Sequence, residues 1–214
     1  MPDITSFSLF VLSVFLLSVT PGPDMAYVIG QSMANGRRAG LLSATGVALG
    51  SVTHALASTL GLTALVAASP LLFTLVKYLG AGYLIYLGSR MLLSTLRHTV
   101  NTAPDSDKIR RGTPARELLL KGYITTLTNP KVLLFFISFF PQFVTPNGSH
   151  HSQAFLILGL TYAWVAFMVD ICCALLGGAA GGALAGSPRI QKVLDRIVGT
   201  TFIALGVRLA LTRR

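Results

Sequence analysis

The sequence predicts an all-α membrane protein with six membrane-spanning helices. Of its 214 residues, 52% are hydrophobic and only 11% are charged, and the mean hydropathy is +0.68. These values lie outside the range of ordinary soluble domains. The apolar runs each approach or exceed the ~20 residues that cross about 30 Å of hydrocarbon as a helix. Because the runs are continuous rather than alternating, they favour helices over strands.

The six runs divide the chain into two groups of three. They extend over residues 7–30, 41–68, 71–93, 118–144, 153–185 and 193–211. The longest polar segment, 94–117, is too short to fold as a domain of its own. We therefore expect one transmembrane domain over 1–214, with a first repeat at 1–96, a cytoplasmic loop at 97–116 and a second repeat at 117–214.

The net charge of +10 is explained by basic residues beside the membrane rather than by nucleic-acid binding. Twelve of the 17 Lys and Arg residues lie in or beside the first, third and fifth connections, and the second and fourth connections contain none. Positive residues mark the cytoplasmic side of membrane proteins. The pattern predicts both termini outside the cytoplasm, although Arg208, Arg213 and Arg214 oppose this orientation.

Prolines interrupt the first and fourth predicted helices near their middles. The first contains "TPGPD" at 20–24, and the fourth contains "TNPK" at 128–131. A single proline is more often a harmless kink. Here each half begins with a broken helix, and with three helices in each half the second half enters the membrane from the opposite side. This is the pattern of an inverted repeat, in which paired breaks point to a transport site.

Each break frees backbone groups that a ligand can use. Pro21, Pro23 and Pro130 have no amide hydrogen, so carbonyls near Thr20 and Thr126 lose their helical partners. Proline is also favoured at the first position of a helix, so half-helices should begin after Pro23 and Pro130. Free amides suit an anion and free carbonyls suit a cation. An amino acid is a zwitterion and carries both.

Three ionisable residues, Asp24, Lys131 and Asp170, lie deepest in the predicted helices, which makes them functional candidates. Asp24 also suits the dipole of the first turn after Pro23. Asp170 lies on a stripe of small residues typical of close helix packing, so we expect it to face the bundle interior. There it can carry a proton, balance an ammonium group, or pair with Lys131 in a purely structural role.

His54 lies on a second small-residue face, with Gly46 and Gly50. It could titrate with a proton gradient, but an interhelical hydrogen bond is the favoured role. Cys172 and Cys173 are adjacent, so they suit packing better than a disulfide or a metal site. We expect no metal site in this chain.

No motif for ATP binding or hydrolysis occurs in the chain. The sequence has no GxxxxGK[ST] phosphate loop, and neither GxSxG nor HExxH is present. We therefore expect neither an enzyme nor a cofactor, and any energy must come from an ion gradient or from the gradient of the substrate. A passive channel or a membrane scaffold is the alternative of a different class.

Several motifs together resemble the LysE/RhtB family of bacterial amino acid exporters. They are "TPGPD", "NGRRAGLLSATGVALG" at 35–50, "KYLGAGYLIYLG" at 77–88, "LTNPKVLLFF" at 127–136 and "FIALGVRLAL" at 202–211. The family's motif positions are occupied here by Pro21, Gly22, Pro23, Asn129, Pro130 and Lys131. The resemblance implies a multi-pass protein of the bacterial inner membrane that exports amino acids or related metabolites from the cytoplasm in exchange for protons.

The resemblance leaves the substrate open, because the family includes exporters of lysine and arginine, of homoserine and threonine, and of leucine, and a few relatives move cadmium. A basic side chain would need an additional carboxylate, and only Asp24 and Asp170 lie deep in the bundle. We therefore favour a neutral amino acid such as threonine, homoserine or leucine. Basic amino acids, another small solute or a metal ion are the alternatives.

In the favoured hypothesis each end of the zwitterion has its own partners. Lys131 and the half-helix after Pro130 bind the carboxylate, while Asp170, Asp24 and carbonyls near Thr20 bind the ammonium or the coupling proton. The lipid bilayer is the surrounding medium. Small-residue faces would also suit contacts between the protomers of a homo-oligomer.

Overall fold

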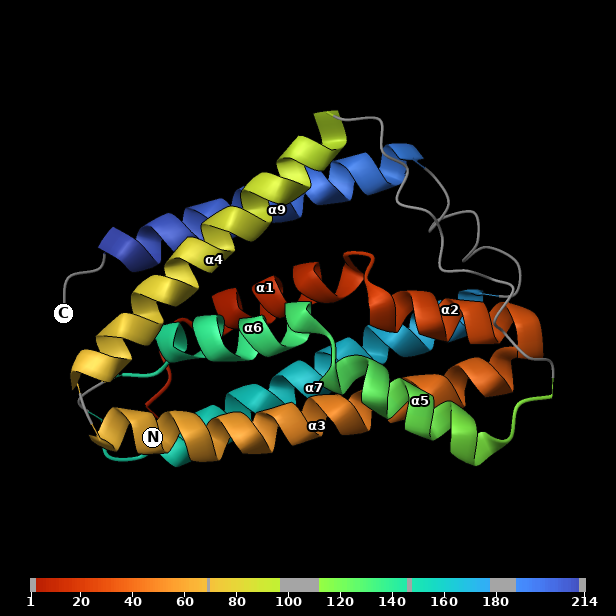
Figure 1. The fold of residues 1–214 in the computed structure, drawn as a ribbon, viewed down its shortest axis with the longest axis horizontal. Coiled ribbons are helices and arrows are strands. Elements are labelled where there is room, and N and C mark those ends of the chain that lie inside the picture. The colour runs from red at the N-terminus through yellow and green to blue at the C-terminus, as the bar shows by residue number, and fades with distance from the viewer. Residues whose placement is uncertain (1–2, 69, 97–111, 146–147, 178–187, 212–214) are drawn as a thin grey trace.

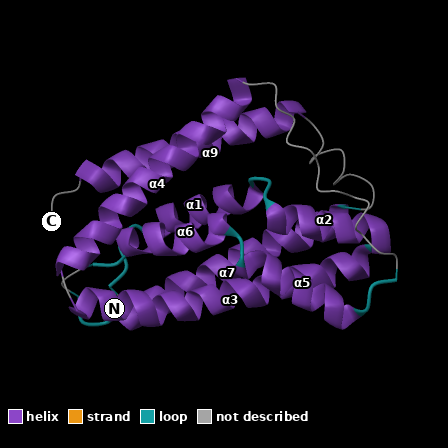
Figure 2. Ribbon diagram, viewed as in Figure 1, coloured by secondary structure: helices purple, strands orange, loops and turns teal. Residues whose placement is uncertain are grey.

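The computed structural model describes residues 3–68, 70–96, 112–145, 148–177 and 188–211. Every named element in these ranges is a helix, and the β-type contact within them is an isolated bridge between Ile4 and Val144. Figure 2 shows the described chain as helices joined by short loops. The prediction of an all-α chain is confirmed.

Each predicted run corresponds to one helix or to a pair of helices. The elements are α1 (Phe7–Val19), α2 (Pro23–Asn35), α3 (Arg37–Ala68), α4 (Pro70–Leu96), α5 (Ala115–Leu127), α6 (Pro130–Phe139), the 3-10 helix η2 (Phe140–Phe143), α7 (His151–Leu176) and α9 (Pro188–Leu211). The fifth run was predicted to continue to residue 185, and 178–187 lie outside the described residues.

Two of the described helices are long and apolar enough to cross a membrane on their own. These spans are Arg37–Thr63 in α3 and His151–Leu176 in α7. Two further candidates are bent pairs, α1 with α2 and α5 with Pro130–Phe143. The helix axis changes direction by 52° in the first pair and by 51° in the second. Over the described residues the structure therefore contains up to four such spans. The other two predicted spans, α4 and α9, are not among them.

The helices form a bundle in which α3 packs along α7 and α4 packs along α9. In Figure 1, α4 and α9 lie together along one side of the bundle, next to α1 and α6, whereas α3, α5 and α7 lie on the other side. The start of α1 and the end of α9 lie toward one end of the bundle, and the junction of α2 and α3 lies at the opposite end (Figure 1). This arrangement agrees with an even number of crossings.

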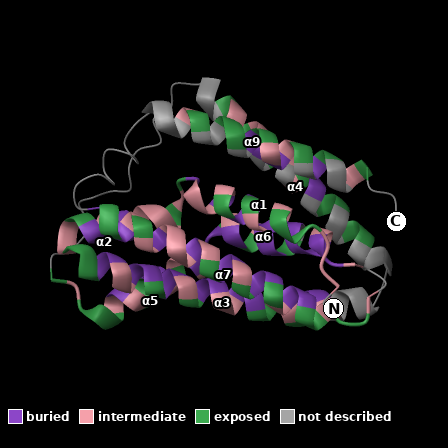
Figure 3. Cartoon of the chain, turned by 180° about the vertical axis from the view of Figure 1, so that it is seen from behind, coloured by how far each residue is buried: buried purple, intermediate pink, exposed green. Residues whose placement is uncertain are grey.

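The interior is aromatic on the side of the breaks where α1 and α6 meet. Phe10 of α1 contacts Phe140 and Phe143 with ring centroids 5.4 and 5.2 Å apart, and Phe136 stacks on Phe140 at 4.4 Å. All four rings are almost fully buried. Figure 3 shows the buried residues concentrated where the helices face one another, and exposed residues on the outer faces. Apolar side chains on the outer faces are the expected surface toward lipid.

Glycines allow the backbones of α3 and α5 to touch. A Cβ added at Gly46 would lie 2.2 Å from the carbonyl oxygen of Leu119, and one at Gly122 would lie 2.6 Å from that of Ser43. Gly50 approaches Thr126 in the same way. The small-residue face predicted on α3 is therefore the contact that positions α5, the first part of the second broken helix.

Candidate functional site

The first break is a three-residue gap between α1 and α2. α1 ends at Val19 and α2 begins at Pro23, with residues 20–22 outside both helices. Pro21 has no amide hydrogen to donate to the carbonyl of Leu17, four residues earlier. The break therefore leaves carbonyl oxygens at the end of α1 that need other partners.

The second break is shorter and has the same cause. α5 ends at Leu127 and α6 begins at Pro130, with only residues 128–129 between them. Pro130 cannot donate to the carbonyl of Thr126, so this oxygen too loses its usual partner. Figure 2 shows both breaks as loops within otherwise helical ribbon.

Lys131 reaches from the second break to the first. Its ammonium Nζ donates to the carbonyl oxygens of Leu17 at 2.7 Å and Thr20 at 2.9 Å. The Leu17 oxygen is the one that Pro21 leaves without its helical partner. The ammonium of Lys131 is thus bound to carbonyls near Thr20, which the sequence predicted to be available to a ligand.

Asn129 makes the reciprocal connection. Its side-chain Nδ2 donates to Asp24 Oδ2 at 3.0 Å, while its Oδ1 accepts from the amide of Lys131 at 3.0 Å and caps α6. Asp24 Oδ1 is buried and has no hydrogen-bond partner among the described residues. Asp24 therefore does more than complement the dipole of α2, because it also joins the two breaks.

The starts of the two half-helices differ. The start of α6, which the sequence predicted as the carboxylate site, already has a side-chain cap in Asn129. The start of α2 has no side-chain cap, because the residue before it is Gly22. The first turn of α2 does carry a carboxylate of the protein, that of Asp24, whereas the first turn of α6 carries none.

His54 is placed beside the second break. Its Nε2 lies 3.2 Å from the carbonyl oxygen of Thr126, the oxygen that Pro130 leaves without its helical partner. Because a carbonyl only accepts, Nε2 must carry the hydrogen in this contact. The ring also stacks on Phe136, with centroids 5.6 Å apart. The interhelical hydrogen bond expected for His54 is confirmed.

A cavity of about 30 Å³ lies where the two breaks meet α7. Its lining includes six of the residues predicted from the sequence: Thr20, Gly22, Asp24, Asn129, Lys131 and Asp170. The predicted Pro21, Pro23 and Pro130 shape the nearby backbone without lining the cavity, and His54 lies outside its lining. The volume suits about two water molecules at 10–15 Å³ each. It is far below the ~300 Å³ of small ligand pockets, so a larger ligand requires the helices to move.

Asp170 and Tyr162 of α7 face this cavity with polar groups. Their exposed fractions are 5% and 4%, and both line the cavity. The inward orientation expected for Asp170 is thus observed. Tyr162 was missed, although Tyr162, Ala166 and Asp170 are four residues apart and share one face of α7.

The charges that line the cavity do not cancel. Asp24 and Asp170 provide two carboxylates and Lys131 provides one ammonium, so the formal charge of the lining is −1 when all three are ionised. The rest of the lining includes apolar side chains, such as Val47 and Val132. This arrangement can accept one further cation together with an apolar group.

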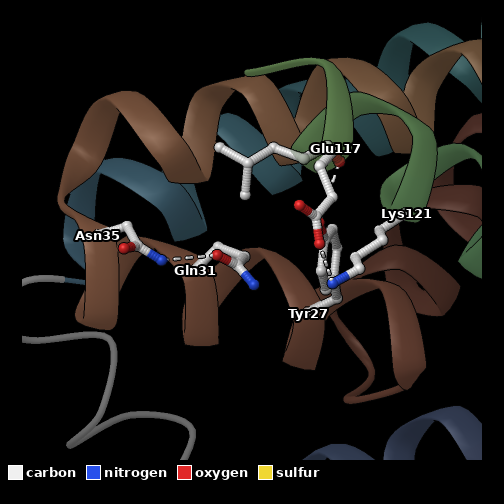
Figure 4. Close-up of polar contacts among 6 residues, drawn as sticks. Tyr27, Gln31, Asn35, Glu117 and Lys121 are labelled. Carbon is white, nitrogen blue, oxygen red and sulfur yellow. Dashed lines mark hydrogen bonds and ion pairs between the residues drawn. The ribbon is translucent and has the colours of Figure 1, made fainter. Parts of the chain in front are cut away.

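Polar contacts close the bundle between α2 and α5. Tyr27 Oη donates to the carbonyl of Leu118 at 3.0 Å. Figure 4 shows this region, with Asn35 and Gln31 hydrogen bonded at 2.9 Å along α2 and Glu117 paired with Lys121 on α5. The pair is half exposed, so it contributes little stability. The α2–α5 side is thus held by a few polar contacts, and the α1–α6 side by buried aromatic rings.

Comparisons with known proteins agree with the motifs. The family model of LysE type translocators matches residues 15–213. The chain is 30% identical over 207 residues to the leucine efflux protein of Enterobacter sp. (strain 638), covering 97% of this chain and 96% of the relative. It is 33% identical over 198 residues to the leucine efflux protein of Klebsiella pneumoniae, covering 92% and 91%. No solved structure matches the chain significantly.

The family match spans both breaks and every residue that lines the cavity, and the two relatives are covered over nearly their whole length. The resemblance seen in the motifs is confirmed. This chain belongs to the family of LysE type translocators, which are membrane transport proteins and not enzymes.

Proposed function

We propose that this protein exports a neutral amino acid, such as leucine, threonine or homoserine, across the bacterial inner membrane in exchange for protons. The observation that carries the proposal is the cavity between the breaks, where two carboxylates, one ammonium and apolar side chains meet. The leucine efflux proteins among its relatives support an amino acid as the substrate.

The apolar side chains of the lining, rather than its charges, support a neutral amino acid. Lys131 balances one of the two carboxylates, which leaves one negative charge for the ammonium of the substrate. A neutral zwitterion leaves the formal charge of the site at −1 and a basic amino acid would bring it to zero, so the charges alone do not exclude a basic amino acid. The substrate's carboxylate pairs with Lys131, and Val47 and Val132 provide contacts for an apolar side chain.

The same charges give a reason for proton exchange. Without substrate, the lining keeps one negative charge inside the bilayer, where an unbalanced charge is costly. A proton on Asp170 or Asp24 removes that charge, and the ammonium of a substrate pairs with the same carboxylates. The proton and the substrate's ammonium therefore compete for one carboxylate, as an exchanger requires.

Movement of two inverted repeats against each other would open the cavity to one side of the membrane and then to the other. We take α1–α2, α3 and α4 as one repeat and α5–α6, α7 and α9 as the other. In support, α3 packs along its counterpart α7 and α4 along its counterpart α9, as a two-fold axis between the repeats would require. Because the cavity is too small for an amino acid, opening on the cytoplasmic side must separate α2 from α5.

Efflux from vesicles tests the proposal. Vesicles loaded with labelled leucine, threonine or lysine should lose the neutral amino acids faster, and a protonophore should abolish movement against a gradient. Asp170→Asn removes one charged partner, worth about 1.5–3 kcal/mol, so the efflux rate should fall roughly 10- to 100-fold. Glu117→Gln is the matched control, because Glu117 lies outside the cavity lining.

Three results would contradict the proposal. Full efflux by Asp170→Asn would remove Asp170 from the site. Gradient-driven uptake that survives the protonophore would exclude proton coupling. Equilibration of the amino acid without any accumulation would identify a passive channel.

A further inference from the structure

We propose that Lys131 is a tethered substitute for the ammonium group of the substrate. In the absence of substrate its Nζ occupies the carbonyls of Leu17 and Thr20, and the arriving ammonium displaces it. This inference rests on the proposed function and assigns a competing cation within the chain to the same site. It makes Lys131 a determinant of which ligands bind.

The two carbonyls form a site for one cation. Pro21 removes the usual helical donor of the Leu17 oxygen, which keeps the amide of Thr20 as a backbone donor at 3.2 Å and can accept a second hydrogen bond. Leu17 and Thr20 are buried, at 1% and 6% exposed. The N–O distances of 2.7 and 2.9 Å are typical of charge-assisted hydrogen bonds. Discontinuous membrane helices use unwound carbonyls in this way to coordinate cations.

The ammonium of Lys131 can leave these carbonyls without unwinding α6. The backbone amide of Lys131 is held separately by Asn129 Oδ1, and the side chain is a flexible four-carbon stem. No side chain stands between the ammonium and Gly22, where an added Cβ would lie 3.6 Å from Nζ.

The exchange explains selection of a zwitterion over a simple amine. An α-ammonium group has three N–H donors, like Lys131, and can occupy the same two carbonyls. An amino acid also brings a carboxylate, which pairs with the displaced Lys131. A simple amine displaces Lys131 and brings no carboxylate, so it should bind the wild-type protein weakly.

The test compares leucine with 3-methylbutylamine, which has the same side chain and ammonium but no carboxylate. Calorimetry on the purified protein measures the affinity of each ligand for wild type, Lys131→Met and Lys131→Gln. Removal of an occupant that blocks the site raises the apparent affinity, so Lys131→Met should bind the amine about 10-fold more tightly than wild type. The same variant should bind leucine more weakly, because its carboxylate loses Lys131.

Stability gives a second reading of the same variant. Lys131→Met leaves the carbonyls of Leu17 and Thr20 without this donor and should melt at a lower temperature, and 3-methylbutylamine should restore the melting temperature by filling the site. The control is Lys121→Met, since Lys121 pairs with Glu117 on α5 and lies outside the cavity lining. It should bind both ligands like wild type and gain no stability from the amine.

The inference is overturned if the amine binds Lys131→Met no more tightly than wild type. If Lys131→Met does not fold, the amine affinity of Lys131→Gln is the test. The glutamine side-chain amide can still donate to a carbonyl but carries no charge. Lys131→Gln should gain amine affinity by a smaller factor, and no gain overturns the inference. Wild-type efflux separates the two proposals: efflux of leucine with no gain in the variants refutes only the role of Lys131, whereas no efflux of any amino acid refutes the proposed function.

Discussion

The two helix breaks lose the same kind of hydrogen bond but are completed by different partners. At the first break the carbonyl of Leu17 accepts from the amide of Thr20 at 3.2 Å and from Lys131, a long side chain that comes from the other half of the chain. At the second break the carbonyl of Thr126 accepts from the amide of Asn129 at 3.1 Å and lies 3.2 Å from the ring nitrogen of His54. His54 is 7% exposed and stacked on an aromatic ring.

The breaks also differ in how their helices are fixed. α6 has a side-chain cap in Asn129, whereas α2 begins after Gly22 without one. α5 is held against α3 by backbone contacts at Gly46. Each break thus has one backbone amide as a donor, and the additional donor is a packed ring at the second break and a flexible ammonium at the first. We infer from this difference that the substrate displaces Lys131 at the first break, and that the second break holds the surrounding helices in place.

Gly46→Ala should cause the largest loss of stability, because it disturbs the contact between α3 and α5 that holds the second break in place. The added Cβ would lie 2.2 Å from the Leu119 oxygen and 2.9 Å from the Leu119 carbonyl carbon, and backbone atoms cannot rotate away. We expect a loss of about 3 kcal/mol in stability, measured by thermal unfolding in detergent. In the control Gly61→Ala, no described atom outside the adjacent turns of α3 lies within 4 Å of the added Cβ. Equal melting of the two variants would show that α5 is not held by this contact.

Asn129→Ala would make the second break resemble the first. It removes the cap of α6 and the donor to Asp24 Oδ2, which together should cost about 2 kcal/mol. Thermal unfolding measures the loss, with Asn35→Ala as a control that removes another amide. A stability equal to wild type would mean that the cap does not distinguish the two breaks.

His54→Leu should have a smaller effect. The amide of Asn129 still donates to Thr126, and leucine keeps an apolar contact with Phe136, so a loss of about 1 kcal/mol is expected. Substrate affinity should hardly change, because His54 lies outside the cavity lining. Thr53→Val, one position earlier on α3, provides the comparison. A large fall in affinity would bring the second break into the binding site.

Local patterns explain how much of this fold the sequence could predict. The run at 41–68 became α3 with the same last residue, because an apolar run ends where its composition changes. Pro23 and Pro130 are the first residues of α2 and α6, as the preference of proline for that position predicts. The stripe of small residues placed Asp170 toward the interior, where it is 5% exposed.

The contacts between the breaks could not be predicted in this way. Lys131 and Leu17 are separated by 114 residues, and their contact depends on how the two halves pack rather than on any local pattern. The same holds for the hydrogen bond of Asn129 with Asp24, 105 residues away. The cap at Asn129 could have been found, since an asparagine before a proline is a common helix start.

Gly22→Ala should have the smallest effect on stability and is the sharpest test of the difference between the breaks. Gly22 has φ −160° and ψ −179°, extended backbone that alanine also adopts. The added Cβ would lie 3.6 Å from Nζ and 3.7 Å from Cδ of Lys131, which are ordinary contacts. The free energy of unfolding should therefore change by less than about 0.5 kcal/mol, and the melting temperature should stay close to that of wild type.

In Gly22→Ala the affinity for leucine should fall although the stability of the protein does not. The methyl group would stand beside the ammonium of Lys131 and narrow the cavity next to the carbonyls of Leu17 and Thr20. We expect leucine affinity to fall about 10-fold, equivalent to roughly 1.4 kcal/mol, while the protein melts like wild type. Unchanged affinity would mean that the substrate does not approach the first break from the side of Gly22. The uncapped start of α2 would then be only a structural difference between the two breaks, with no part in selecting the substrate.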